Sequence, residues 1–69
     1  MQHNVIGERI KELRLDYKLS QVQLGERLSV SQDTISLWEK GKALPNTEYI
    51  IRMCRIFDIS ADYLLGLKD

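Results

Sequence analysis

Two predicted helices follow each other so closely in this chain that they must pack as a unit, and this constrains the fold more than any other feature. Ser20 and Gln23 form the capping-box pattern that begins a helix, which should run from about residue 21 to 28. Ser31 is a good N-cap for the next helix, which Gly41 ends. About three residues, the cap included, join the two, which is the short connection of a helix-turn-helix at about residues 21–40. The second helix is therefore held by the first.

Three further helices are predicted on either side of this unit. Asn4 is a fair N-cap for a helix whose apolar stripe has helical spacing and consists of Ile6, Ile10, Leu13 and Tyr17. Asn46 or Thr47 caps another helix, which is apolar almost all round and is expected to be the most buried element. Its apolar residues are Ile50, Ile51, Met53, Cys54, Ile56 and Phe57. Ser60 caps a last short helix, which runs through Leu64 and Leu65 and which Gly66 ends. The prediction is an all-α fold of five short helices and no strand.

The chain is 69 residues long, which allows one domain at most, over residues 1–69, with a core near the lower size limit for folding without disulfides or metal. Cys54 is the one cysteine and cannot close an intramolecular disulfide. No apolar run approaches the length of a signal peptide core or a membrane span, so we expect a cytoplasmic protein with no membrane partner. Ten basic and ten acidic side chains cancel, so net charge alone predicts neither nucleic acid nor membrane as a partner.

The helix that follows Ser31 is expected to show the solvent an unusual face. Each residue advances the helix by about 100°, so Trp38 lies about 60° from Ile35 and both point inward. On the opposite side cluster Asp33, Ser36, Leu37 and Lys40, and Gln32 projects from the first turn. A glutamine amide can form two hydrogen bonds to the edge of an adenine. Leu37 and the Thr34 methyl can contact a thymine methyl, and the hydroxyls can form hydrogen bonds to bases of either strand. This mixture of polar and apolar groups suits a contact with the major groove of DNA better than exposure to water alone.

A family resemblance rests on the segment LSQVQLGERLSVSQDTISLWEKGKALPNTEYI, with IGERIKELR before it and FDISADYLLG after it. These residues resemble the Cro and phage-repressor type of helix-turn-helix family, also called the XRE type. The resemblance covers the chain from about Ile6 to Gly66, and the combination SQxxLxxRLxVSxxTISxWExGKxxP is specific. It implies a compact, lambda-repressor-like DNA-binding domain whose third helix enters the major groove, usually as a dimer on a two-fold related operator. The implied function is a sequence-specific DNA-binding transcriptional regulator, and more specifically a repressor.

The resemblance also implies a role for individual positions. For base readout these are Gln32, Asp33, Ser36 and Leu37; for the DNA backbone they are Gln21, Ser31, Thr34, Lys40, Lys42 and Asn46. Arg14 and Glu39 are implied to form an ion pair that ties the first helix to the end of the third. The family usually has Gly where Ser29 and Asp58 stand, at positions expected to need a left-handed backbone, and Ala where Gly25 stands.

Two of these positions keep a second interpretation. Asp33 could accept a bond from cytosine N4, or its carboxylate could serve the positive end of its own helix and repel unwanted DNA. Leu37 could meet DNA, or it could contact the core or a protein partner. A rival function follows from the second interpretation of Leu37. The same fold could be a protein-interaction module, antitoxin-like or antirepressor-binding, with DNA binding secondary.

No catalytic, metal or cofactor site is predicted. The sequence has one His, no Cys-x-x-Cys pair and no Gly-rich phosphate loop, and no Ser, His and Asp set suits nucleophilic catalysis. Cys54 stands among apolar neighbours and is expected to be an inert core residue. We therefore expect no enzyme activity, no cofactor and no small-molecule ligand.

The expected partners are double-stranded DNA and a second copy of the chain. One short recognition helix reads too few bases for useful specificity, and two half-sites multiply it, so a homodimer is expected on DNA. The dimer contact should lie around the last helix, where apolar side chains exceed the evident needs of a small core. The residues expected there are Ile59, Ala61, Tyr63 and Leu67.

Overall fold

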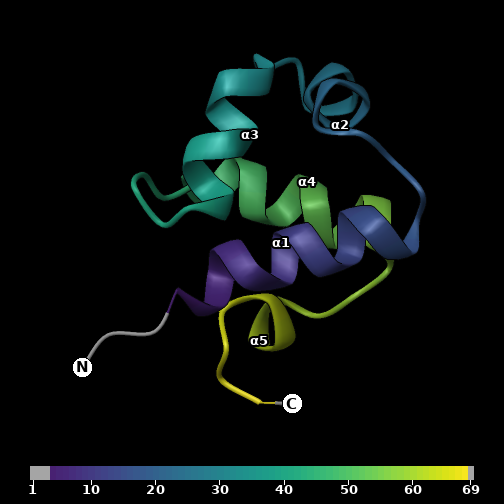
Figure 1. Ribbon diagram of the computed structural model, residues 1–69. Coiled ribbons are helices and arrows are strands. Elements are labelled where there is room, and N and C mark those ends of the chain that lie inside the picture. The colour runs from purple at the N-terminus through teal and green to yellow at the C-terminus, as the bar shows by residue number, and fades with distance from the viewer. Residues whose placement is uncertain (1–3, 69) are drawn as a thin grey trace.

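The computed structural model describes residues 4–68, which contain five helices and no strand (Figure 1). The helices are α1 (Val5–Asp16), α2 (Gln21–Leu28), α3 (Gln32–Glu39), α4 (Thr47–Phe57) and α5 (Ala61–Leu64). In Figure 1, α2 and α3 lie at the top of the molecule and α5 lies at the bottom, beneath α1. Helix α3 packs against both α2 and α1, whereas α5 packs against α1 and α4. The predicted all-α, five-helix fold is confirmed.

Every helix begins with a side-chain cap, which explains why its boundary could be predicted. The side chains of the five caps accept the backbone N–H of the residue three positions on; the caps are Asn4, Ser20, Ser31, Asn46 and Ser60. For α4 the cap is Asn46 rather than Thr47. At α2 the Gln23 side chain also accepts the Ser20 N–H at 2.8 Å, so the predicted capping box is complete. Each such cap stabilises its helix by about 1 kcal/mol.

Within residues 4–68, three non-glycine residues have a left-handed backbone, and two of them were predicted. Ser29 ends α2 with φ 60° and Asp58 ends α4 with φ 54°. Lys18, with φ 59°, was not predicted; it follows Tyr17, the C-cap of α1, and its N–H bonds the Leu15 carbonyl at 3.0 Å. Left-handed backbone costs a residue with a Cβ roughly 1–2 kcal/mol, so all three turns carry strain.

One hydrophobic cluster unites the helices. Its fully or nearly buried members are Ile10, Leu13, Leu19, Leu24, Leu28, Ile35, Trp38, Ile50, Met53, Phe57 and Leu64. As predicted, Ile35 and Trp38 give α3 its inner face. α4, which was expected to be the most buried element because it is apolar almost all round, has one side open to solvent. Ile51 is 45% exposed, because α4 meets its neighbours through the face of Ile50, Met53 and Phe57 and leaves the other side to solvent.

Tyr17 also departs from the prediction that it belongs to the buried stripe of α1. Its side chain is 47% exposed. The ring packs edge-on against Phe57 with centroids 5.0 Å apart, and the hydroxyl donates to the Phe57 carbonyl at 2.8 Å. The reason is that a tyrosine at the rim of a core can bury its ring edge while its hydroxyl bonds a free helix-end carbonyl.

Close backbone approaches hold α3 in place. A Cβ on Gly25 would lie 2.6 Å from the Val30 carbonyl oxygen, so glycine lets the turn between α2 and α3 fold tightly onto α2. A Cβ on Gly7 would collide with the Trp38 carbonyl oxygen, so α1 also approaches α3 through a glycine. Because α3 is fixed on two sides, its remaining face is presented rigidly to the outside. Within residues 4–68, no helix has the length and apolar character needed to span a membrane.

Candidate nucleic-acid interface

The outward face of α3 brings together the side chains predicted to read bases. Gln32 and Asp33 are exposed, Leu37 is 42% exposed, and Ser36 is partly buried beside them. Asp33 and Leu37 are four residues apart and therefore neighbours on one face of the helix. The face offers an amide, a carboxylate, a hydroxyl and an isobutyl group, which is a set of donors, acceptors and apolar surface rather than a charged patch.

At the start of α3, Ser31 and Thr34 bond each other. The Ser31 hydroxyl accepts the Thr34 N–H at 3.1 Å and lies 3.0 Å from the Thr34 hydroxyl. Ser31 remains exposed and Thr34 is partly buried. Both hydroxyls thus have a fixed position at the helix N-terminus, where backbone N–H groups and the helix dipole favour an anion.

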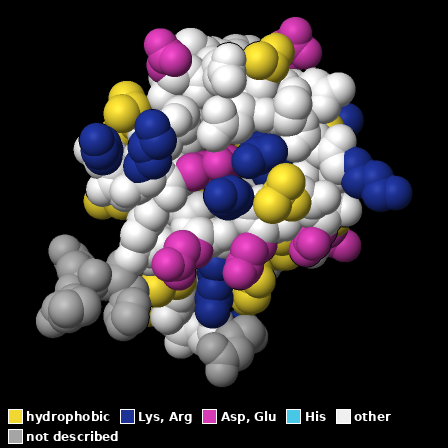
Figure 2. Space-filling view, in the orientation of Figure 1, with side chains coloured by type: hydrophobic (Ala, Val, Ile, Leu, Met, Phe, Trp, Pro, Cys, Tyr) yellow, Lys and Arg dark blue, Asp and Glu magenta, His cyan; other side chains and the backbone are white. Residues whose placement is uncertain are grey.

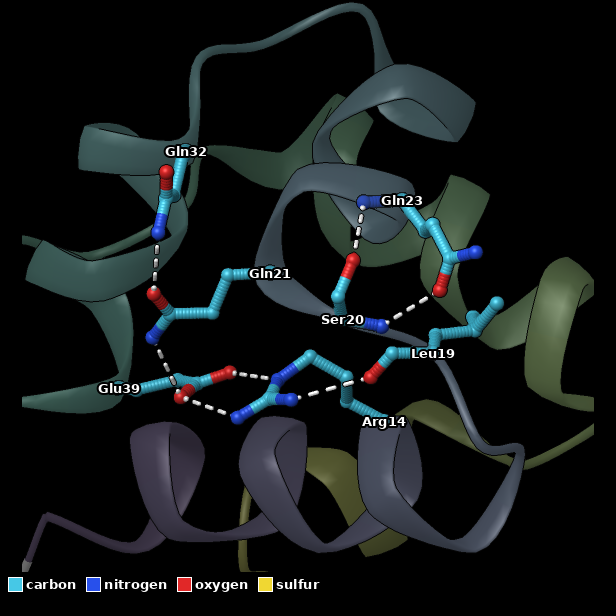
Figure 3. Close-up of polar contacts among 7 residues, drawn as sticks. All are labelled: Arg14, Leu19, Ser20, Gln21, Gln23, Gln32 and Glu39. Carbon is cyan, nitrogen blue, oxygen red and sulfur yellow. Dashed lines mark hydrogen bonds and ion pairs between the residues drawn. The ribbon is translucent and has the colours of Figure 1, made fainter.

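A polar chain of side chains runs from Gln32 into the interior (Figure 3). The Gln32 Nε2 donates to Gln21 Oε1 at 3.3 Å, and the Gln21 Nε2 donates to Glu39 Oε1 at 3.1 Å. Gln21 is the first residue of α2, so this chain links the beginnings of the two helices of the helix-turn-helix with the end of α3. Gln21 and Gln32 were predicted to have separate roles, and the contact between them was not predicted. Their placement opposite each other depends on how α2 and α3 pack, which spacing along the chain does not give.

Arg14 and Glu39 form the ion pair that the family resemblance implied. The Arg14 Nε lies 2.7 Å from Glu39 Oε2, and its NH2 donates to Glu39 Oε1 at 3.2 Å. The third guanidinium nitrogen donates to the Leu19 carbonyl at 3.0 Å. The two side chains are 11% and 5% exposed. A bidentate pair with so little solvent contact fixes the end of α3 against α1.

Asn4 adds a second tie between α1 and α3. Its side-chain oxygen accepts the Gly7 N–H, while its Nδ2 donates to the Glu39 backbone carbonyl at 2.7 Å. One amide therefore caps the beginning of α1 and satisfies a carbonyl at the end of α3. Only the cap was predicted, because the second contact spans 35 positions of the chain.

Three of the six side chains predicted to contact the DNA backbone, Lys40, Lys42 and Asn46, lie around the connection between α3 and α4. Lys40 and Lys42 are both exposed. The connection is folded against α3, because the backbone N–H groups of Lys42 and Ala43 both donate to the Leu37 carbonyl, at 2.9 and 3.3 Å. Asn46 uses its side-chain oxygen as the cap of α4 and keeps its NH2 group for another partner. Leu44, which was not among the predicted site residues, is 71% exposed in the same connection.

Charge on the face of the molecule shown in Figure 2 is mixed. Figure 2 shows Lys and Arg side chains interspersed with Asp and Glu over the face in view, without a broad field of either sign. This agrees with the formal net charge of zero. A chain of zero net charge provides no long-range attraction to DNA through its net charge.

The residues predicted to form a dimer contact have different environments. Ala61 and Leu67 are exposed, whereas Ile59 and Tyr63 are partly buried against the core. The Arg9 guanidinium lies 4.2 Å from the centroid of the Tyr63 ring and donates to the Tyr63 and Lys68 carbonyls. Part of Tyr63 is thus already covered by α1.

Cys54 is partly buried on α4, and desolvation by that burial raises the pKa of its thiol. A raised pKa lowers the thiolate fraction at neutral pH and with it the reactivity of the sulfur. Within residues 4–68, no group of three or more His, Cys, Asp and Glu side chains could hold a metal ion.

The comparisons with known proteins agree with this geometry. A helix-turn-helix family model matches residues 10–64. The transcriptional activator BcrR of Enterococcus faecalis is 41% identical over 60 residues, which are 87% of this chain and 29% of that protein. The repressor protein C2 of Salmonella phage P22 is 37% identical over 65 residues, which are 94% of this chain and 30% of that protein. The chain thus spans about 30% of the length of each of these two curated relatives.

Solved structures match the backbone over almost the whole chain. The P22 c2 repressor in complex with a synthetic operator has a TM-score of 0.81 at 36% identity, covering 93% of this chain and 94% of that one. The biofilm regulator SinR in complex with DNA has a TM-score of 0.77 at 28% identity, covering 87% of this chain and 97% of that one. Together, the sequence match, the fold and the exposed face of α3 establish that the chain belongs to the helix-turn-helix family of the Cro and phage-repressor (XRE) type.

Proposed function

We propose that this chain is a sequence-specific DNA-binding transcriptional regulator, specifically a repressor, that places α3 in the major groove of a two-fold symmetric operator. The observation that carries the proposal is the exposed face of α3, held rigidly between α1 and α2. The support from comparison is a backbone match to P22 c2 repressor bound to an operator, at a TM-score of 0.81. The proposed place of action is the cytoplasm, and the proposed chemistry is binding without catalysis.

Base readout is assigned to four side chains of α3. Gln32 has the amide that pairs with an adenine edge, Asp33 can accept from cytosine N4, Leu37 can meet a thymine methyl, and Ser36 can serve as donor or acceptor. No Lys or Arg stands among these four, so a guanine edge, which presents two acceptors, has no charged donor to meet it. The proposed operator half-site is therefore read through adenine, cytosine and thymine groups.

Backbone contacts are assigned to Gln21, Ser31, Thr34, Lys40, Lys42 and Asn46. Two of these six are cationic, so most phosphates would be met by amides, hydroxyls and the N-termini of α2 and α4. Two basic contacts per subunit give about four per dimer, which predicts a slope of log affinity against log salt of about −4. Non-specific affinity should accordingly be modest.

The proposed binding unit is a homodimer with its contact around α5. Leu67 is 71% exposed and Ala61 is exposed beside it, so these two provide the free apolar surface, and Ile59 and Tyr63 extend it. A selected DNA site should then contain an inverted repeat, because the operator mirrors the two-fold axis of the protein. A selected site without any inverted repeat would contradict the dimer.

A second candidate function is a protein-interaction module that serves as an antitoxin or binds an antirepressor. The observation in its favour is apolar surface beside the α3 face: Leu37 is 42% and Leu44 is 71% exposed. The antitoxin PezA of Streptococcus pneumoniae is also a relative, at 31% identity over 62 residues, covering 90% of this chain and 39% of that protein. The DNA proposal is preferred because a purely apolar contact would not require Gln32, Asp33 and Ser36 beside the leucines.

Selection from a randomised DNA pool, followed by a gel-shift titration, separates the two candidates. A DNA-binding regulator enriches one sequence, with affinity well above that for scrambled DNA. A protein-interaction module enriches none. The selected sequence would also give the operator needed for the experiments below.

A further inference from the structure

The C-terminal end of α2 is held by an arginine from α4. A helix leaves the backbone carbonyls of its last turn without partners inside the helix. In α2, two of these carbonyls accept N–H groups from the turn that follows. The other two, those of Arg27 and Leu28, accept from the NH2 and NH1 groups of Arg52, at 3.3 and 3.1 Å. One guanidinium thus completes the hydrogen bonding of the end of α2 from outside the helix-turn-helix.

The same arginine belongs to a run of side chains that reaches the end of α3. Its guanidinium lies 5.9 Å from the centroid of the Tyr49 ring, which is one turn earlier on α4. The centroid of the Tyr49 ring lies 5.4 Å from that of Trp38, a buried residue in the last turn of α3. In Figure 1, α4 runs below α2 and α3. Neighbouring side chains of α4 therefore contact the end of α2 and the end of α3.

The carbonyls that Arg52 binds lie close to the start of α3. Leu28 is the last residue of α2, and the N-cap of α3, Ser31, follows three positions later. So short a turn passes a shift of the α2 end on to the first turn of α3, which carries Gln32 and Asp33. Hydrogen bonds to base edges weaken steeply with poor geometry, whereas a lysine on its flexible stem can follow a phosphate. A small displacement of α3 therefore costs base readout before it costs contacts to the DNA backbone.

We propose that Arg52 is a positioning residue for DNA recognition, which holds the end of α2, and with it the start of α3, where the α3 face fits one DNA sequence. The inference rests on the proposed DNA-binding function and adds to it a residue outside the helix-turn-helix. The planar guanidinium suits this role because its N–H groups form a rigid fork, so two of them can bind successive carbonyls at once.

The test compares affinities for the selected operator and for scrambled DNA, at a temperature where circular dichroism shows each variant to be folded. Arg52→Met keeps an unbranched side chain with good helix propensity and removes every donor. Its affinity for the operator should fall about tenfold, the effect of losing one good base contact. Its affinity for scrambled DNA should stay within about twofold of the parent, and its salt slope should not change, because the contacts to phosphates remain.

Arg52→Lys separates positioning from a direct contact with DNA. A lysine binds phosphate as a point charge, so a phosphate contact would tolerate this change. It cannot reproduce the fork on two carbonyls, so operator affinity should still fall by about threefold or more. This variant also decides the question if Arg52→Met does not fold.

Arg55→Met is the matched control, because Arg55 is an exposed cation on the same helix and its loss changes the net charge equally. Both affinities should stay within about twofold of the parent. Equal losses on operator and scrambled DNA in Arg52→Met, or parent-like binding to the operator in either Arg52 variant, would show that Arg52 does not position α3. If the parent protein enriches no DNA sequence, the proposed function itself fails, which is a different result.

Discussion

Removing Arg14 should destabilise the protein far more than removing an exposed cation from the same helix. In Arg14→Ala, the Glu39 carboxylate, which is 5% exposed in the intact protein, loses both guanidinium donors, and the Leu19 carbonyl loses the Arg14 NH1. Leaving one partner of a buried pair uncompensated costs about 3–5 kcal/mol, whereas an exposed pair contributes about 1 kcal/mol or less. The bond from Gln21 to Glu39 survives and some solvent reaches the pair, so we expect a loss of about 2–4 kcal/mol.

For a domain of this size, 1 kcal/mol corresponds to a change in Tm of roughly 4–8 °C, so a loss of about 2–4 kcal/mol should lower the melting temperature by about 8–30 °C. Thermal and urea unfolding followed by circular dichroism measure this loss. Lys11→Ala is the control, because Lys11 is an exposed cation on α1, and its Tm should stay within a few degrees of the parent. Glu39→Ala should resemble Arg14→Ala, and the double mutant should lose less than the sum of the two. If Arg14→Ala melted as Lys11→Ala does, the ion pair would not support the fold and the reasoning would be refuted.

Three further predictions concern stability and reactivity. Asn4→Ala should lower the free energy of unfolding, measured in urea, by about 1–2 kcal/mol, because the cap of α1 and the bond to the Glu39 carbonyl disappear together. A loss below a few tenths of a kcal/mol would contradict the double role of Asn4. Ser29→Gly should raise the Tm more than Asp58→Gly, since both backbones are left-handed and Asp tolerates that conformation better than Ser; the reverse order in thermal melts would count against this reading. Because burial raises the pKa of the Cys54 thiol, the folded protein should react with a thiol reagent more slowly than the urea-unfolded chain at pH 8, and equal rates would show an accessible sulfur.

The helix boundaries could be predicted because they depend on residues close together in sequence. Ser20 with Gln23 and Ser31 with Thr34 are contacts over three positions, and the structure contains both. The same holds for the left-handed ends at Ser29 and Asp58, where the family resemblance supplied the expected backbone. These features depend on contacts between residues close in sequence rather than on how the helices pack.

Features that depend on how helices meet escaped prediction. Apolar spacing placed Tyr17 and Ile51 inside, yet both are nearly half exposed, because a helix buries only the face that a neighbour covers. The left-handed Lys18 has no sequence signal of its own. In the candidate interface, the exposed face of α3 followed from helical geometry, whereas the bond between Gln21 and Gln32 required the crossing of α2 and α3. The residue types were evident from the sequence and their connections were not.

The most direct test of the central claim, that α3 reads DNA sequence, is to measure the affinities of Gln32→Ala and Lys42→Ala for the selected operator and for scrambled DNA. Gln32→Ala should lose about 1–3 kcal/mol of binding free energy on the operator and little on scrambled DNA. It should also lose the base preference at one position of each half-site. Lys42→Ala should weaken both DNAs about equally and reduce the salt slope by about 1 per subunit. Equal losses for Gln32→Ala on operator and scrambled DNA would refute base readout by α3. Unchanged DNA binding in both variants would favour the alternative function, the binding of a protein partner.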